Sequence, residues 1–148
     1  MGEIIEGKGR FIPDLIAGLN SLLGEPWWGI PAHYGPDHPK ESDQTVDLFN
    51  AETAGLVAWI RYMLADRLGD EMQQRIDKEI DKRLLNPALN TNYWWKHSRM
   101  NWTPWICSNW LTAVLISEKE ETKKREAIRQ IKAALQTFID GYPNDGGC

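Results

Sequence analysis

An apolar residue returns every three or four positions along most of this chain. The clearest example is residues 71–85, where Met72, Ile76, Ile80 and Leu84 follow one another at four-residue steps. This spacing places the four side chains on one face of an α-helix. No window alternates apolar and polar residues for long enough to indicate a β-strand. The sequence therefore predicts an all-α protein.

The same spacing predicts further helices, over residues 10–23, 47–68 and 104–116 and from Ser117 to Asp140. Residues 104–116 are apolar on nearly every side, which is typical of a buried helix. Ser117 and Glu120 have the spacing of a capping box at the start of the last helix. Gly141 and Pro143 are the residue types that follow a helix end. Between these helices lie two long segments, residues 24–46 and 86–103, that we expect to be loops meeting at one end of the helices.

The helix predicted over residues 47–68 carries an apolar stripe made of Phe49, Leu56, Ile60, Met63 and Leu64. Trp59 lies near the same face of this helix, and Trp110 lies within the helix predicted over residues 104–116. We expect both of these tryptophans to belong to the hydrophobic core.

Length and charge limit the class of protein. The chain has 148 residues, and we expect residues 1–148 to form a single helical domain. Its net charge is −4 with acids and bases interleaved, whereas nucleic-acid-binding proteins usually carry a basic stripe. No stretch approaches the roughly 18 apolar residues of a membrane span. We therefore expect neither nucleic acid nor a membrane as a partner.

Metal, cofactor and targeting signals are also missing from the sequence. Cys107 and Cys148 form no CxxC pair, and the spacing of His33, His38 and His97 matches no metal site. No phosphate-binding loop or dinucleotide-binding glycine pattern is present, so we expect no cofactor. The first residues, MGEIIEGKGRF, lack the apolar core of a signal peptide. This indicates a cytoplasmic protein, or a periplasmic or secreted one if a leader has been removed.

Tryptophan is the unusual residue type in this composition, with eight in the chain. Six lie in or beside the two predicted loops: Trp27, Trp28, Trp94, Trp95, Trp102 and Trp105. An indole face packs against the apolar face of a sugar ring, while its N–H group donates to a hydroxyl. Any one of these tryptophans can instead close the end of a helical layer. As a group they favour a sugar-binding cleft.

Amide and basic side chains accompany the tryptophans. Asn101 lies between Met100 and Trp102, where a buried amide needs a hydrogen-bond partner. Asn109 is expected to brace its helix, and the remaining asparagines fit loop and cap chemistry. Lys96, His97 and Arg99 either face an anionic ligand together or form a solvated loop. For His33 the alternatives of a loop-packing residue and a cleft residue stay open.

Five blocks of the sequence together resemble one known family. They are GKGRFIPDL, WWGIPAHYG, TVDLFNAETA, NYWWKHSRMNWTPWICSNWL and FIDGYPNDGGC, and they cover nearly the whole chain. In this order they are similar to the helical domain of the heparinase II/III-like polysaccharide lyases. The resemblance implies an incomplete (α/α) toroid built of antiparallel helix pairs with long aromatic-rich loops. It also implies a substrate cleft at one end of the helices and cleavage of a uronate-containing polysaccharide by β-elimination.

The resemblance also implies roles for individual residues. Asn101 matches the residue that neutralises the substrate carboxylate, so that the neighbouring proton can leave. The substrate-binding residues are then Trp94, Trp95, His97, Arg99, Trp102, Trp105, His33 and Trp28. The expected partner is an acidic polysaccharide or oligosaccharide.

The sequence departs from the family where a catalytic tyrosine and a later histidine are expected. We therefore expect a truncated toroid without lyase activity of its own, and an exposed apolar flank along its last helices that promotes self-association. Three alternatives remain: a non-catalytic carbohydrate-binding helical module, a toroid similar to the unsaturated glucuronyl hydrolases, and a purely structural helical domain.

Overall fold

The computed structural model describes residues 1–33 and 45–146, so His38 and Cys148 lie outside the described residues. Within these ranges the chain is helical and contains no strand, which confirms the all-α prediction. The elements are α1 (Gly2–Glu6), α2 (Ile12–Gly24), the 3₁₀ turn η1 (Pro31–His33), α3 (Leu48–Met63), α4 (Ala65–Ile80), the π-helical turn η2 (Asp81–Leu85), α5 (Asn86–Asn90), the 3₁₀ turn η3 (Trp94–His97), α6 (Trp102–Ser117) and α7 (Glu121–Asp140).

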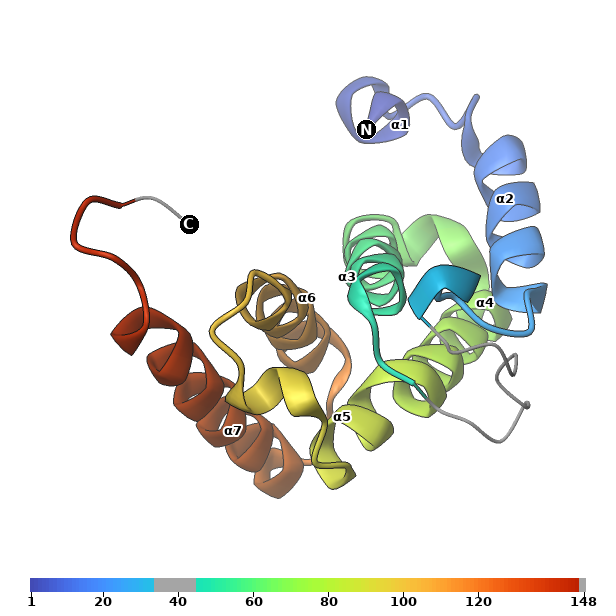
Figure 1. Ribbon diagram of the computed structural model, residues 1–148. Coiled ribbons are helices and arrows are strands. Elements are labelled where there is room, and N and C mark those ends of the chain that lie inside the picture. The colour runs from blue at the N-terminus through green and yellow to red at the C-terminus, as the bar shows by residue number, and fades with distance from the viewer. Residues whose placement is uncertain (34–44, 147–148) are drawn as a thin grey trace.

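Helices α3 and α6 lie side by side in the middle of the molecule and are both seen nearly end-on in Figure 1. Helix α4 packs against both α3 and α2, while α7 packs against α6 and η3. The first turns of α3 and α6 meet around His33, and Gly55 meets Asn109 farther along. The two central helices therefore run in the same direction, with the first turns of both at one end of the molecule.

Small side chains let α3 and α6 approach closely. The buried face of α3 includes Ala51, Ala54, Gly55 and Ala58. A Cβ atom added at Gly55 would lie 2.5 Å from Oδ1 of Asn109, so the two backbones meet where α3 has no side chain. Asn109 also donates from Nδ2 to the carbonyl of Trp105, 3.0 Å away. Asn109 therefore braces both its own helix and the contact with α3.

The large apolar stripe predicted for α3 faces mostly outward. Phe49, Leu56, Trp59 and Met63 are exposed, and Trp59 keeps 45% of its surface accessible. The prediction that Trp59 belongs to the core is wrong, because the face of small residues forms the contact with α6. Trp110 is fully buried, as predicted.

The boundaries of α3 and α4 differ from the predicted ones. The helix expected over residues 47–68 ends at Met63, because Leu64 leaves helical geometry at φ −124 and ψ 21. Helix α4 starts at once and contains Gly69 in a conformation with φ 72 that favours glycine. The stripe predicted over residues 71–85 is confirmed, with Ile76, Ile80 and Leu84 fully buried.

Two predictions around α6 and α7 are wrong. Ser117 is the last residue of α6 and is buried there, while Glu120 precedes α7 and makes no side-chain cap. The predicted capping box therefore does not form. The segment expected to be a loop over residues 86–103 contains α5 and η3. The end of α7 at Asp140, followed by Gly141, is as predicted.

Exposed apolar residues gather on α1, α3 and α6. Leu115 and Trp105 are exposed on α6, and a largely apolar pocket of about 360 Å³ opens between α1, α2 and α3 beside Leu56 and Trp59. On α7, Ile139 is the large exposed apolar side chain, and most of the exposed face is charged or polar. Of the last two helices, on which an apolar flank is expected, α6 thus carries exposed apolar residues and α7 carries few. No helix within residues 1–33 and 45–146 has both the length and the apolarity of a membrane span.

Candidate functional site

A buried carboxylate orients a histidine where α3 begins. Asp47 precedes α3 and is fully buried. Its Oδ1 accepts from the backbone N–H of Asn50 at 2.7 Å, which caps the helix. Its Oδ2 lies 2.7 Å from Nδ1 of His33 and 3.3 Å from the backbone N of Ile30. A carboxylate oxygen accepts hydrogen bonds, so Nδ1 of His33 carries a proton and the ring is held in one orientation.

Aromatic rings from three other elements lie beside this histidine or beside its neighbour Trp102. The ring centroid of His33 is 4.6 Å from that of Trp102 on α6 and 5.9 Å from that of Phe49 on α3. Trp94 on η3 lies 5.0 Å from Trp102 and has 52% of its surface exposed. We call His33, Phe49, Trp94 and Trp102 the aromatic patch. Through His33 it joins the first predicted loop to the second, as expected for two loops that meet at one end of the helices.

Asn101 and Trp105 are also at the start of α6. Asn101 directly precedes the helix with φ −58 and ψ −15, and its side chain makes no capping bond. Its carbonyl accepts from the backbone N–H of Trp105 at 3.3 Å. Both side chains are exposed, so the predicted need of a buried Asn101 amide for a partner does not arise. Solvent or a ligand can reach both residues.

Two of the tryptophans expected to bind substrate are core residues. Trp95 is fully buried, stacks on Tyr93 at 5.6 Å, and donates from Nε1 to the carbonyl of Val46 at 3.1 Å. Trp28 is buried below the guanidinium of Arg83, with Nε1 bonded to the carbonyl of Leu22 at 2.9 Å. The assignment of Trp95 and Trp28 as ligand contacts is corrected here, because their rings face protein and not solvent.

The three neighbouring basic residues do not face one ligand. Lys96 points inward and is buried. His97 is exposed, and its Nε2 lies 2.6 Å from Oδ1 of Asn92. Arg99 is exposed and lies against Gly141, where any Cβ atom would overlap its side chain. The predicted grouping of Lys96, His97 and Arg99 is therefore wrong for Arg99, which is directed toward Gly141, while Lys96 and His97 line one pocket.

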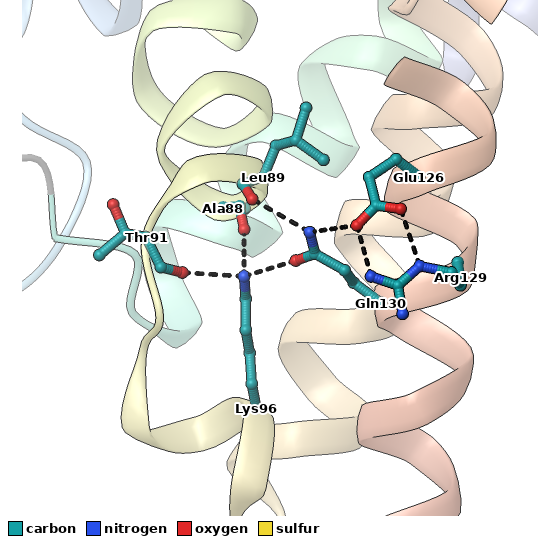
Figure 2. A network of polar contacts seen from close by, with 7 residues as sticks. All are labelled: Ala88, Leu89, Thr91, Lys96, Glu126, Arg129 and Gln130. Atoms are coloured by element: carbon teal, nitrogen blue, oxygen red, sulfur yellow. Dashed lines mark hydrogen bonds and ion pairs between the residues drawn. The ribbon is translucent and has the colours of Figure 1, made fainter. Parts of the chain in front are cut away.

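Lys96 is the centre of a polar network that joins α5, η3 and α7 (Figure 2). Its Nζ donates to the carbonyl of Ala88 at 2.5 Å, to that of Thr91 at 2.8 Å, and to Oε1 of Gln130 at 2.8 Å. Burial lowers the pKa of Lys96. The ammonium also lies 5.2 Å from the ring centroid of Trp110, within reach of a cation–π contact.

Two other kinds of site, a reactive thiol and a metal-binding cluster, are not found among the described residues. Burial raises the pKa of the Cys107 thiol to about 12, so it stays protonated and is a poor nucleophile. The part of the chain that the structure describes contains no group of three or more His, Cys, Asp or Glu side chains able to hold a metal ion.

Sequence reasoning missed Asp47 and Phe49 as parts of this site. Asp47 lies at the start of a predicted helix, where a negative charge is favourable because of the helix dipole, so nothing in the sequence indicates a further role for it. Phe49 was placed in the apolar stripe of its helix. A histidine 14 positions before an aspartate gives no indication of contact until the fold brings η1 to the start of α3.

Comparisons with known proteins assign no role to these residues. A scan against models of protein families finds no match, and a search of curated proteins finds none either.

Proposed function

We propose that this chain is part of a polysaccharide lyase-like protein and binds a uronate-containing polysaccharide at the aromatic patch. The observation that supports the proposal is the grouping of half-exposed Trp94 with Trp102, Phe49 and an oriented His33 at the start of α6. Such rings pack against the C–H faces of sugars, and the polar edges of His33 and Trp94 supply hydrogen bonds. The resemblance in sequence adds the uronate as the sugar class.

Asn101 is the proposed contact of the uronate carboxylate. Abstraction of the proton next to a carboxylate builds negative charge on that group, and a neutral amide donor aimed at it lowers the barrier. Asn101 is exposed at the start of α6, one residue before Trp102, with Trp105 one turn farther. We expect residues 1–148 to bind oligosaccharide without cleaving it, because the resemblance assigns the proton-transfer tyrosine to no residue of this sequence. Appearance of unsaturated uronate product would contradict this.

A non-catalytic carbohydrate-binding module is the second candidate. The same observation favours it, because the aromatic patch suffices for binding and needs no acid or base. Activity of a longer polypeptide on the oligosaccharide that residues 1–148 bind would separate the two.

Binding is tested with two exposed tryptophans. We expect Trp94→Ala to weaken binding of a uronate oligosaccharide by about tenfold, the loss of roughly 1.4 kcal/mol that one stacking contact supplies. Trp59→Ala is the matched control, since Trp59 is similarly exposed but lies ten residues along α3 from Phe49, about 15 Å away. Isothermal titration calorimetry measures both. Equal effects of the two substitutions would argue against the aromatic patch.

The carboxylate contact has its own test. Asn101→Ala should reduce binding of the uronate oligosaccharide while leaving binding of the same oligosaccharide with its carboxyl groups reduced to alcohols unchanged. If both ligands lose affinity equally, Asn101 does not contact the carboxylate.

We also propose that the exposed apolar residues of α1, α3 and α6 promote association of two copies of this chain. Leu56 and Trp59 are exposed beside the apolar pocket of about 360 Å³, and large apolar surfaces of this kind commonly form contacts. Light scattering should show a mass that rises with concentration, and Leu56→Glu should lower it. A monomer at every concentration would contradict the proposal.

A further inference from the structure

A second pocket, of about 340 Å³, lies on the other side of η3 from the aromatic patch. Its walls come from α5, the segment after it, η3 and α7. Small residues of α7 leave the space, since Ala133 and Ala134 lie along its wall. Its polar lining consists of Asn90, Thr91, Asn92, Lys96, His97, Arg129, Gln130 and Thr137. The volume suits one sugar ring or a comparably small polar molecule.

The charge beside this pocket is unusual. Lys96 is buried, yet its ammonium donates to three neutral oxygens, two from carbonyls and one from Gln130. Among residues 1–33 and 45–146 no carboxylate lies within ion-pair distance of it. Buried charges in proteins are usually paired with an opposite charge. Lys96 therefore places an uncompensated positive charge next to an open pocket.

The nearest acid is already engaged elsewhere. Figure 2 shows Glu126 on the far side of Gln130 from Lys96. Glu126 receives two hydrogen bonds from Arg129, at 2.7 and 2.6 Å, and one from Gln130 at 2.9 Å. The bonds from Arg129 and Gln130 lower the pKa of Glu126 to about 2, so it stays ionised as their partner. It attracts Lys96 from a distance and makes no ion pair with it.

The rest of the lining includes the cation of Arg129 and several side-chain amides, and no carboxylate among the described residues. Glu126 occupies one edge of the Arg129 guanidinium, through Nε and Nη2. The amide oxygen of Asn92 accepts from Nε2 of His97, which leaves the amide N–H groups of Asn92 available to a ligand. We propose that this pocket binds an oxyanion, the carboxylate of a uronic acid or a sulfate group, beside the buried ammonium of Lys96. Arg129 and the amide N–H groups of Asn92 hold the oxyanion, while the three N–H groups of Lys96 keep their protein partners.

This second site is independent of the proposed function. Sodium glucuronate, sodium sulfate and glucose are the probes, each titrated into the uniformly ¹⁵N-labelled 148-residue chain at constant ionic strength. We expect saturable NMR shifts in the side-chain amides of Asn90, Asn92 and Gln130 with glucuronate, sulfate or both, and none with glucose. Response to glucuronate alone identifies a sugar carboxylate as the ligand, response to sulfate alone a sulfate group, and response to both an oxyanion in general. No response to either anion, or an equal response to glucose, would overturn the proposal.

Matched variants locate the site. Arg129→Gln should weaken binding of the anion by about tenfold, because one charge-assisted hydrogen bond is lost. Arg125→Gln is the control, because Arg125 is on the same helix and pairs with Glu121 as Arg129 pairs with Glu126. Ala133→Phe should abolish binding by filling the pocket, and since Ala133 is exposed the fold should persist. Equal weakening by Arg129→Gln and Arg125→Gln, or undiminished binding to a folded Ala133→Phe variant, would refute the pocket as the site.

Discussion

Replacing Trp95 by alanine should lower the free energy of unfolding by about 3–5 kcal/mol, the range measured for removal of a large buried aromatic side chain. Trp95 is fully buried, with Tyr93 stacked on its face and Trp110 edge-on at 6.1 Å. Its substitution also leaves the carbonyl of Val46 without the donor that it has in the native protein. The loss combines an empty volume with an unsatisfied acceptor.

The neighbouring residue supplies the control. Trp94 is half exposed and contacts Trp102 on the surface, so Trp94→Ala should cost no more than about 1 kcal/mol. Urea unfolding followed by circular dichroism measures both variants, and the slopes of the two transitions should agree. A similar loss in both would mean that Trp95 does not anchor the core. Sugar binding should show the reverse order, with Trp94→Ala affected and Trp95→Ala retaining affinity while it stays folded.

This pair of tryptophans shows what the sequence can and cannot predict. Trp94 and Trp95 are adjacent, identical in type and in the same predicted loop, so composition alone assigned them one role. The 3₁₀ turn η3 directs one ring outward and the next inward, against Trp110. Such a turn is only four residues long and leaves no periodic pattern in the sequence.

Helix α3 shows a second kind of limit. Its apolar period was predicted correctly, and the helix exists, but two of its faces are apolar. One carries Phe49, Leu56 and Met63, and the other carries Ala51, Ala54 and Ala58. Larger side chains favour the first face as the buried one. The close contact of Gly55 with Asn109 selects the second, because only small residues allow α6 to approach.

The contact between His33 and Asp47 shows a third kind of limit to prediction from the sequence. Asp47 has a local role at the start of α3, where Oδ1 accepts from the backbone N–H of Asn50. The other oxygen is free to accept from His33, which arrives from a separate turn. A carboxylate has two oxygens, and a local role for one of them does not exclude a distant partner for the other.

Replacing Lys96 by methionine should lower the free energy of unfolding by about 3 kcal/mol or more, because buried acceptors that lose their donor each cost roughly 1–3 kcal/mol. The substitution leaves the carbonyls of Ala88 and Thr91 and Oε1 of Gln130 without the ammonium. Methionine keeps the length of the side chain and so limits the empty volume. Lys132→Met, on the exposed face of α7, is the control and should change stability by no more than about 0.5 kcal/mol.

The same variant gives a pH test whose sign follows from the lowered pKa of Lys96. Between that pKa and the ordinary lysine value of 10.5, the unfolded chain holds more protons at this lysine than the folded protein. Stability therefore rises with pH across this interval in the native protein, and Lys96→Met loses this contribution. The difference in unfolding free energy between the two proteins should grow as the pH approaches 10.5, measured by urea unfolding at successive pH values. A difference that shrinks with pH would mean that the folded protein stabilises the ammonium form. A saturating oxyanion in the neighbouring pocket should reduce the growth, because a bound negative charge raises the pKa of Lys96 toward its ordinary value.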